Sequence, residues 1–237
     1  MRELIKKMAA AIIFCSFLLS GEAIAQEFRT KSRPRSQTDA MEALLFEFTA
    51  KSAVAIRDGN AQGAFRQLIE VSTGNRENDI EIKAVLRNDY SGLSCVFAKE
   101  DKISVQISHR DERGNPDGVS CTVENRNGTF SFYAQRYGEL NVETELAKAR
   151  EEIRALHPNL REVETPINRA SNNVPSYDNV ATNTQSASFE FQENFRQQIE
   201  SVFVTQREGW LLHLRHKGPK SRGLAASSAW YSFLAAR

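Results

Sequence analysis

The chain has 237 residues, 41% of them hydrophobic and 26% charged, and a formal net charge of +1. This length fits one large domain or two small ones, and the apolar content is enough to bury a core without several disulfides. A chain so close to neutral lacks the broad positive field used in nucleic-acid binding, so we expect no nucleic-acid partner.

The N-terminus has the pattern of a secretory signal peptide. Three basic residues precede an apolar run over residues 8–20, and a small-x-small cleavage site ends at Ala25. The apolar run is too short to span a bilayer. We therefore predict that residues 1–25 are removed on export, which takes away three basic and two acidic residues and leaves a net charge of zero. The predicted localisation is periplasmic or secreted, with no integral membrane segment after cleavage.

Residues 26–38 are predicted to form a polar tail, and the main α+β domain is predicted to span residues 39–157. A helix opens this domain, because Asp39 is a good N-cap residue and Glu42 completes a pair that resembles a capping box. Apolar side chains recur at helical spacing until the helix ends at Asp58. This apolar stripe predicts that the helix packs on a sheet.

A second, shorter helix is expected to follow. Phe65, Leu68 and Ile69 would form its inward face, and Gly74 would end it. This helix too is expected to pack on the sheet.

Residues 79–135 have the pattern of five short strands. Apolar and polar side chains alternate within five consecutive segments: 80–86, 93–98, 103–108, 119–124 and 129–135. A period of two, repeated five times, indicates half-buried antiparallel strands. The predicted fold class is therefore α+β, with an antiparallel sheet of about five strands and flanking helices.

Two strand registers follow from matching the apolar faces. Asn127-Gly128 is a hairpin signal, and a turn centred there pairs Val123 with Phe132. A three-residue loop between the second and third strands would place Phe97 opposite Val105.

Cys95 and Cys121 are the two cysteines that remain after cleavage, and an even number in an oxidising compartment predicts a disulfide. Two buried thiols are the alternative. In a plain meander an intervening strand separates these cysteines by about 10 Å, whereas a disulfide requires Cα atoms within about 7 Å. The bond therefore requires either that the second and fourth strands are neighbours, or that the sheet folds over and the cysteines face each other across a layer.

The opposite face of these strands is polar but almost uncharged. It comprises Ser94, Ser104, Gln106, Ser108, Ser120, Thr122, Ser131, Tyr133 and Gln135. Solvated faces usually carry more lysine and glutamate. A surface for a polar ligand is one explanation, and partial cover by C-terminal strands or a plain exposed face is the other.

A further helix is predicted after this sheet. Asn141 caps it, an apolar seam runs through residues 142–156, and Pro158 ends it. Residues 158–188 are rich in Asn, Ser, Thr and Pro, which predicts a flexible loop or linker.

Residues 189–237 are predicted to be a β-rich segment that packs on the main domain. Glu208-Gly209 lies at the turn of a hairpin that pairs Phe203 with Leu214. Residues 229–234 are expected to form a final strand. The segment either joins the sheet or forms a second small lobe.

Catalytic and cofactor signatures are absent from the sequence. It contains no H-E-x-x-H, no C-x-x-C, no phosphate-binding glycine loop and no G-x-S-x-G. We therefore assign no catalytic residue, metal site or cofactor. Residues 109–118 form an acidic loop whose carboxylates are of the kind that Ca²⁺ takes, but its Pro-Asp-Gly turn favours a plain hairpin loop.

One basic cluster is a candidate anion-binding site for an anionic sugar, a phospholipid head group or a polymer. Its members are His213, Arg215, Lys217, Lys220 and Arg222. The alternative is a charged loop that faces water. We expect the cluster to lie mainly in a loop, where binding residues are frequent.

These features favour an exported, non-enzymatic protein that binds or scaffolds a component of the cell envelope, either an unknown envelope protein or a polar ligand. The alternative is a small secreted hydrolase with a dispersed Ser/His/acid site, which would place His109, His157 or His213 within about 3 Å of a serine or cysteine. A third class, a periplasmic inhibitor or chaperone, would expose an apolar groove or a sheet edge.

Overall fold

The computed structural model describes residues 37–73, 80–138, 141–166 and 184–235. The predicted signal peptide and nearly all of the predicted polar tail lie outside these ranges. The chain divides after Glu42, and the packing described below belongs to the unit that begins at Ala43.

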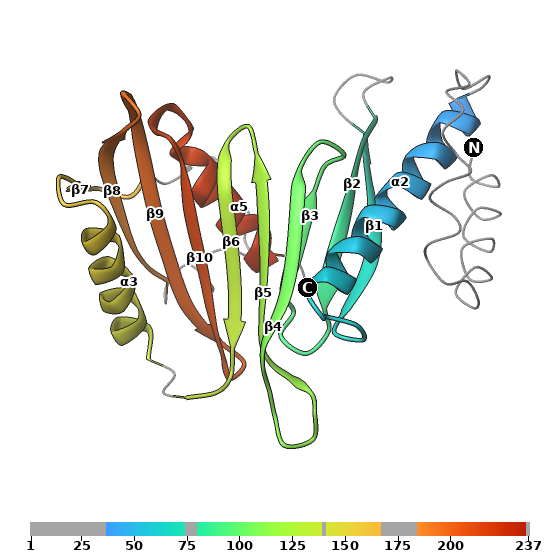
Figure 1. Cartoon of the computed structure of the whole chain (residues 1–237), viewed down its shortest axis with the longest axis horizontal. Coiled ribbons are helices and arrows are strands. Elements are labelled where there is room, and N and C mark those ends of the chain that lie inside the picture. The colour runs from blue at the N-terminus through green and yellow to red at the C-terminus, as the bar shows by residue number, and fades with distance from the viewer. Residues whose placement is uncertain (1–36, 74–79, 139–140, 167–183, 236–237) are drawn as a thin grey trace. The chain divides into compact units, whose positions relative to one another are not determined.

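Strands dominate the described chain (Figure 1). The strands are β1 (Phe65–Thr73), β2 (Ile80–Asn88), β3 (Ser94–Phe97), β4 (Lys102–Arg110), β5 (Pro116–Asn125), β6 (Gly128–Gln135), β7 (Arg161–Val163), β8 (Gln185–Glu193), β9 (Arg196–Arg207) and β10 (Trp210–Pro219). The helices are α2 (Gln37–Asp58), α3 (Val142–Leu156) and α5 (Leu224–Ala235), with a short 3-10 turn, η3 (Lys220–Arg222).

The predicted α+β class is confirmed, and all five strands expected between residues 79 and 135 are present. They belong to two antiparallel sheets rather than one: a three-stranded sheet with the order β1-β2-β3, and a seven-stranded sheet with the order β4-β5-β6-β10-β9-β8-β7. The expected pairing of Phe97 with Val105 is therefore wrong, because β3 pairs with β2 and β4 pairs with β5.

The hairpin at Glu208-Gly209 has the predicted register, with Phe203 opposite Leu214. The β5–β6 hairpin differs, because Asn125 pairs with Gly128 and Val123 pairs with Phe130. This shift of two residues keeps the apolar faces matched. At Gly128 a Cβ atom would approach the carbonyl oxygen of Lys217 to 2.3 Å. The glycine is therefore required by the close approach of β10, and it pairs with Asn125 at the end of the hairpin instead of occupying the centre of the turn.

The Cys95–Cys121 disulfide is present and joins β3 to β5. The two Cα atoms are 6.3 Å apart, and both residues are buried. Since β3 and β5 belong to different sheets, the chain folds over and the cysteines meet across a layer. Of the two arrangements that the bond allowed, the structure adopts this one.

The seven-stranded sheet has an apolar core on each face. On one face, β4, β5, β6, β9 and β10 share a core with α5, with the small sheet and with the C-terminal half of α2. On the other face, Val202, Val204 and Leu211 pack under α3, together with Ala187 and Phe189 of β8. Figure 1 shows α3 beside β8 and β9.

Helix α3 begins and ends as predicted. The Oδ1 atom of Asn141 accepts a hydrogen bond from the amide of Thr144 at 2.9 Å, and the amide of His157 donates to Ile153 at 3.0 Å. Leu146 and Ile153 are buried, whereas Leu156, at the end of the predicted seam, is 64% exposed.

Two predicted elements have the wrong type. The expected helix around Phe65 is strand β1, because β-branched residues such as Ile69 pair along the whole length of β2. The expected final strand is helix α5, in which Ala226, Trp230 and Leu234 recur every four residues on one buried side.

The predicted linker, residues 158–188, contains strand β7 and the start of β8, which pair with each other. At the other end of the chain, α2 already includes Gln37 and Thr38, two residues before the predicted cap. None of the helices described is long and apolar enough to cross a bilayer.

Candidate functional site

A cavity of about 600 Å³ lies between α5, β3 and the floor formed by β5 and β6. We call it the α5/β3 pocket. Its lining residues are Lys83, Ser94, Val96, Phe97, Ala98, Asp101, Val123, Asn125, Asn127, Phe130, Phe132, Ala225, Ser228, Ala229, Ser232 and Phe233. Ligand sites in proteins fall in this size range and combine apolar walls with a few polar groups.

The floor of the pocket is apolar. Val123, Phe130 and Phe132 come from β5 and β6, on the face of the sheet that looks toward α5. The ring of Phe132 lies 5.2 Å from the ring of Phe233, which comes from the helix. A bound group would therefore rest on aromatic and branched side chains from both the sheet and the helix.

The helical wall of the pocket consists of small residues. Ala225 and Ala229 are four residues apart, as are Ser228 and Ser232, and each alanine lies three residues before a serine. The four residues therefore share one face of α5. The neighbouring face carries the large buried side chain of Trp230. Alanine and serine side chains are short, so this wall leaves space between α5 and β3.

The opposite wall is held by the disulfide. Ser94 and Val96 flank Cys95 on β3, and both line the pocket. Cys121, on β5, lies two residues before the floor residue Val123. The bond thus fixes the wall and the floor to one another at a buried point.

The polar rim is braced by short-range hydrogen bonds. The Oδ1 atom of Asn125 accepts from the amide of Asn127 at 2.8 Å, and the Oδ2 atom of Asp101 accepts from the amide of Ala98 at 2.9 Å. These contacts hold the turns that close the pocket. Lys83, from β2, supplies a cation to the lining.

A buried histidine lies beside the floor, opposite Phe130 on the neighbouring strand. The ring of His216 is 4.5 Å from the ring of Phe130, and its Nε2 atom donates to the carbonyl of Asn127 at 3.1 Å. Burial lowers the pKa of His216, opposed by the Asn127 carbonyl and by the charge of Glu200. The imidazole is therefore a neutral support for the floor.

Comparison with known proteins gives no family for this chain. No protein-family model matches the sequence, and no curated protein matches it. What supports a function is therefore the geometry of the described residues.

A second hollow, of about 660 Å³, lies between α2 and the edge strand β4. No aromatic ring lines it, and its charged groups are engaged: Lys99 pairs with Glu47 at 2.8 Å, and the Nζ atom of Lys51 donates to the Lys99 carbonyl at 2.6 Å. A Cβ atom at Gly59 would lie 1.5 Å from the Val105 carbonyl oxygen. The turn after α2 thus contacts the sheet edge and blocks an added strand at that point.

The basic cluster lies mainly in a strand instead of the predicted loop. His213, Arg215 and Lys217 alternate along β10 on the face that carries α3, and η3 carries Lys220 and Arg222. Four of these five side chains have carboxylate partners: His213 with Glu145 at 3.6 Å, Arg215 with Glu200 and with Glu152, Lys217 with Glu193 at 2.7 Å, and Lys220 with Glu190 at 2.9 Å. Anion binding by this cluster stays a prediction, and an anion would compete with these carboxylates.

Contacts between histidine and glutamate side chains hold α3 on the sheet at both ends of the helix. Glu145, near the start of the helix, contacts His213, and a hydrogen bond from this histidine lowers the pKa of Glu145. His157, which caps the other end, lies 3.6 Å from the buried carboxylate of Glu200. The apolar seam of α3 is therefore bounded by charged contacts.

The histidine contacts bear on the hydrolase alternative. His109, His157 and His213 each face a carboxylate, and His216 donates to a backbone carbonyl. Among the described residues, no hydrogen bond joins a histidine to a serine or cysteine, and none of the four histidines lines either hollow. The geometry that the hydrolase required is therefore not found in the described chain.

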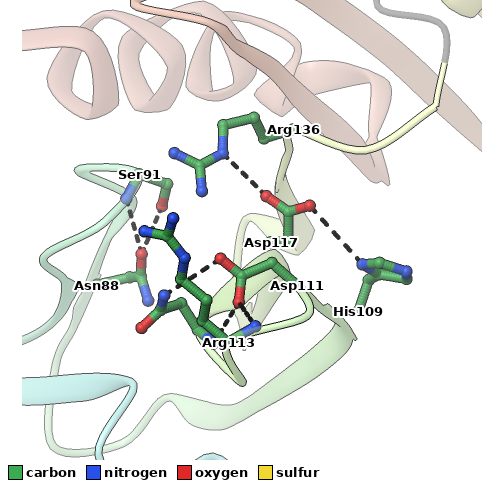
Figure 2. Close-up of polar contacts among 8 residues, drawn as sticks. Asn88, Ser91, His109, Asp111, Arg113, Asp117 and Arg136 are labelled. Atoms are coloured by element: carbon green, nitrogen blue, oxygen red, sulfur yellow. Dashed lines mark hydrogen bonds and ion pairs between the residues drawn. The ribbon is translucent and has the colours of Figure 1, made fainter.

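The acidic loop between β4 and β5 is braced from within (Figure 2). Asp111 accepts hydrogen bonds from the amides of Arg113 at 3.0 Å and Asn115 at 2.7 Å, and the side chain of Asn115 lowers its pKa. Asp117 pairs with Arg136 at 2.9 Å and faces His109 at 3.8 Å. These carboxylates hold the hairpin, and no group of three metal-binding side chains occurs among the described residues.

Most of the pocket is not predicted by the sequence patterns. The small-residue stripe of α5 has helical spacing, but the aromatic residues beside it favour the strand that was expected over residues 229–234. The recurrence of Ala225, Ala229 and Phe233 every four residues was the signal that could have revealed this wall.

Proposed function

We propose that this protein is an exported, non-enzymatic binding protein of the cell envelope, and that the α5/β3 pocket holds its ligand. The observation that carries the proposal is the cavity of about 600 Å³, with aromatic residues in its floor and polar groups at its rim. The signal-peptide pattern of residues 1–25 supports export, and the Cys95–Cys121 bond is compatible with an oxidising compartment.

The lining points to an amphipathic ligand. Phe130, Phe132 and Phe233 provide an apolar bed, which favours rings or an aliphatic chain. Asn125, Asn127 and the other polar rim residues offer donors and acceptors for a single polar end. Burial of the apolar body supplies affinity and the rim sets orientation, the usual division of roles in a small-molecule site.

Binding explains this arrangement better than hydrolysis does. The serine residues in the lining, Ser94, Ser228 and Ser232, lie in a pocket that no described histidine lines. A serine nucleophile needs an adjacent base, and the described histidines contact carboxylates or a carbonyl instead. We therefore assign no catalytic residue.

A substitution that fills the pocket provides the test. Ala229→Phe would place a ring in the cavity, whereas Ala147→Phe makes the same change at an exposed position of α3. The probe is 1-anilinonaphthalene-8-sulfonate, which has an apolar ring system and one polar end. We expect residues 26–237 to bind it with a fluorescence increase, and Ala229→Phe to weaken binding about tenfold or more.

The control variant Ala147→Phe should bind like the wild-type chain. Far-UV circular dichroism checks that both variants are folded. No binding by the wild-type chain, or equal binding by Ala229→Phe, would contradict the proposed site.

A further inference from the structure

The seven-stranded sheet has a polar surface on the face opposite the α5/β3 pocket. Helix α3 packs on β8 and β9 of this face, while β4, β5 and β6 present two rows of cross-strand neighbours. One row is Gln106, Ser120 and Tyr133, and the other is Ser104, Thr122 and Ser131. We call these six residues the polar sheet face. Ser104, Gln106 and Tyr133 are exposed and the other three are half-buried.

The polar sheet face carries no charge, and three basic side chains beside it are paired with carboxylates. At the β4 edge, Lys102 pairs with Glu124 at 3.4 Å. On the β10 side, Arg215 pairs with Glu200, and Lys217 with Glu193. An ionic ligand would meet no free counter-charge on these six residues, whereas a neutral ligand would meet only hydroxyl and amide groups. The electrostatics therefore favour an uncharged partner.

Tyr133 provides an aromatic platform within this surface. It is 39% exposed, and its neighbours on the flanking strands are Ser120 and His213. The ring of His213 lies 5.4 Å from the Tyr133 ring and is itself held by Glu145. An exposed ring beside a fixed neighbour suits contact with a flat, partly apolar surface.

The polar groups around Tyr133 are suited to a polyhydroxylated chain. Serine and threonine hydroxyls both donate and accept hydrogen bonds, and the Gln106 amide does the same through separate atoms. The Oγ1 atom of Thr122 and the Oγ atom of Ser131 already lie 3.2 Å apart, which sets adjacent hydroxyls at hydrogen-bonding distance. Sugar hydroxyls present the same kind of group, and the C–H side of a pyranose ring can pack on Tyr133.

We propose that the polar sheet face binds a neutral, unbranched polysaccharide chain. The polysaccharide would lie across β4, β5 and β6, with one sugar ring on Tyr133 and its hydroxyls hydrogen-bonded to the two rows of polar side chains. This surface would anchor the protein to a glycan of the envelope, while the α5/β3 pocket stays open on the other face. The two proposals use different residues and can fail separately.

The test is an NMR titration of ¹⁵N-labelled residues 26–237 with cellohexaose and with hexa-N-acetylchitohexaose, two neutral β-1,4-linked chains. At least one of them should shift amide signals of β4, β5 and β6. Tyr133→Ala should weaken the affinity about tenfold, and Tyr133→Phe, which keeps the ring, should bind within about threefold of the wild-type chain.

The matched control is Tyr90→Ala, because Tyr90 is 48% exposed in the turn between β2 and β3. This variant should leave binding unchanged. The proposal is overturned if neither oligosaccharide shifts these signals at millimolar concentration, if the shifts map to the α5/β3 pocket, or if both alanine variants bind alike. Preferential binding of heparin that is lost in salt would also overturn it, in favour of the basic cluster.

Discussion

Two buried ionisable side chains from neighbouring strands, Glu200 and His216, satisfy different physical requirements. Glu200 faces α3, where Arg215 donates to one of its carboxylate oxygens and His157 lies 3.6 Å from the other. His216 lies beside the pocket floor and contacts the ring of Phe130 and the carbonyl of Asn127. Glu200 is therefore buried against basic side chains, whereas burial lowers the pKa of His216 and favours its neutral form.

The lowered pKa of His216 predicts a pH-dependent stability. Above about 6.5, the ordinary pKa of histidine, both folded and unfolded chains hold it neutral. Below that pH the unfolded chain takes up a proton that the folded chain resists, so the free energy of unfolding falls as the pH decreases toward the folded pKa. Each pH unit in this window costs up to about 1.4 kcal/mol.

His216→Gln removes the titrating group while keeping a side-chain N–H near the Asn127 carbonyl. Urea unfolding curves between pH 5 and 8, which span the window about the ordinary histidine pKa, should show a smaller loss of stability for this variant than for the wild-type chain. If the free energy of unfolding had the same dependence on pH in the two proteins, His216 would be protonated as readily in the folded state as in the unfolded state.

At the scale of elements, strand β3, anchored by the disulfide, and helix α5 form opposite walls of one cavity. β3 is only four residues long and belongs to the small sheet, so its position over β5 depends on the Cys95–Cys121 bond and on the core around Phe97. The ring of Phe97 meets that of Phe48 from α2 at 5.8 Å. Loss of the bond should therefore loosen the β3 wall more than the α5 wall.

The double substitution Cys95→Ser and Cys121→Ser tests this dependence. With a sequence separation of 26 between the cysteines, the chain-entropy model predicts a loss of about 3 kcal/mol in the free energy of unfolding. The double variant should also bind 1-anilinonaphthalene-8-sulfonate at the α5/β3 pocket more weakly than the wild-type chain. Reductant alone should leave the folded wild-type chain unchanged, because both cysteines are buried; rapid reduction without denaturant would contradict this account.

The sequence patterns that specify local structure predicted much of the fold. The α3 cap at Asn141 and the hairpin at Glu208-Gly209 depend on residues close together in the chain, and both predictions are confirmed. Element type failed around Phe65 and Trp230, where short apolar runs suit either a helix or a strand and tertiary contacts decide. The alternation of apolar and polar residues also carries no information on which sheet a strand joins. The geometry of a disulfide between Cys95 and Cys121 limits the possible strand arrangements to two.

At the scale of the whole unit from Ala43 onward, the seven-stranded sheet separates two chemically different surfaces. One face bears the α5/β3 pocket with its aromatic floor, and the other bears α3 and the polar sheet face. The polar sheet face was visible in the alternation of Ser120, Thr122 and Ser131 along the sequence. The pocket was not, because it arises only when α5 is a helix and β3 crosses over β5.

The account depends most on a ligand that binds between β3 and α5, and hydrogen exchange measured by mass spectrometry tests this most directly. With saturating 1-anilinonaphthalene-8-sulfonate, amides of Ser94–Phe97, of the turn at Asn125–Gly128 and of Leu224–Ala235 should exchange more slowly. Amides of α3 should exchange as in the free protein. Protection at α3, or no protection at either pocket wall, would contradict the proposed binding site.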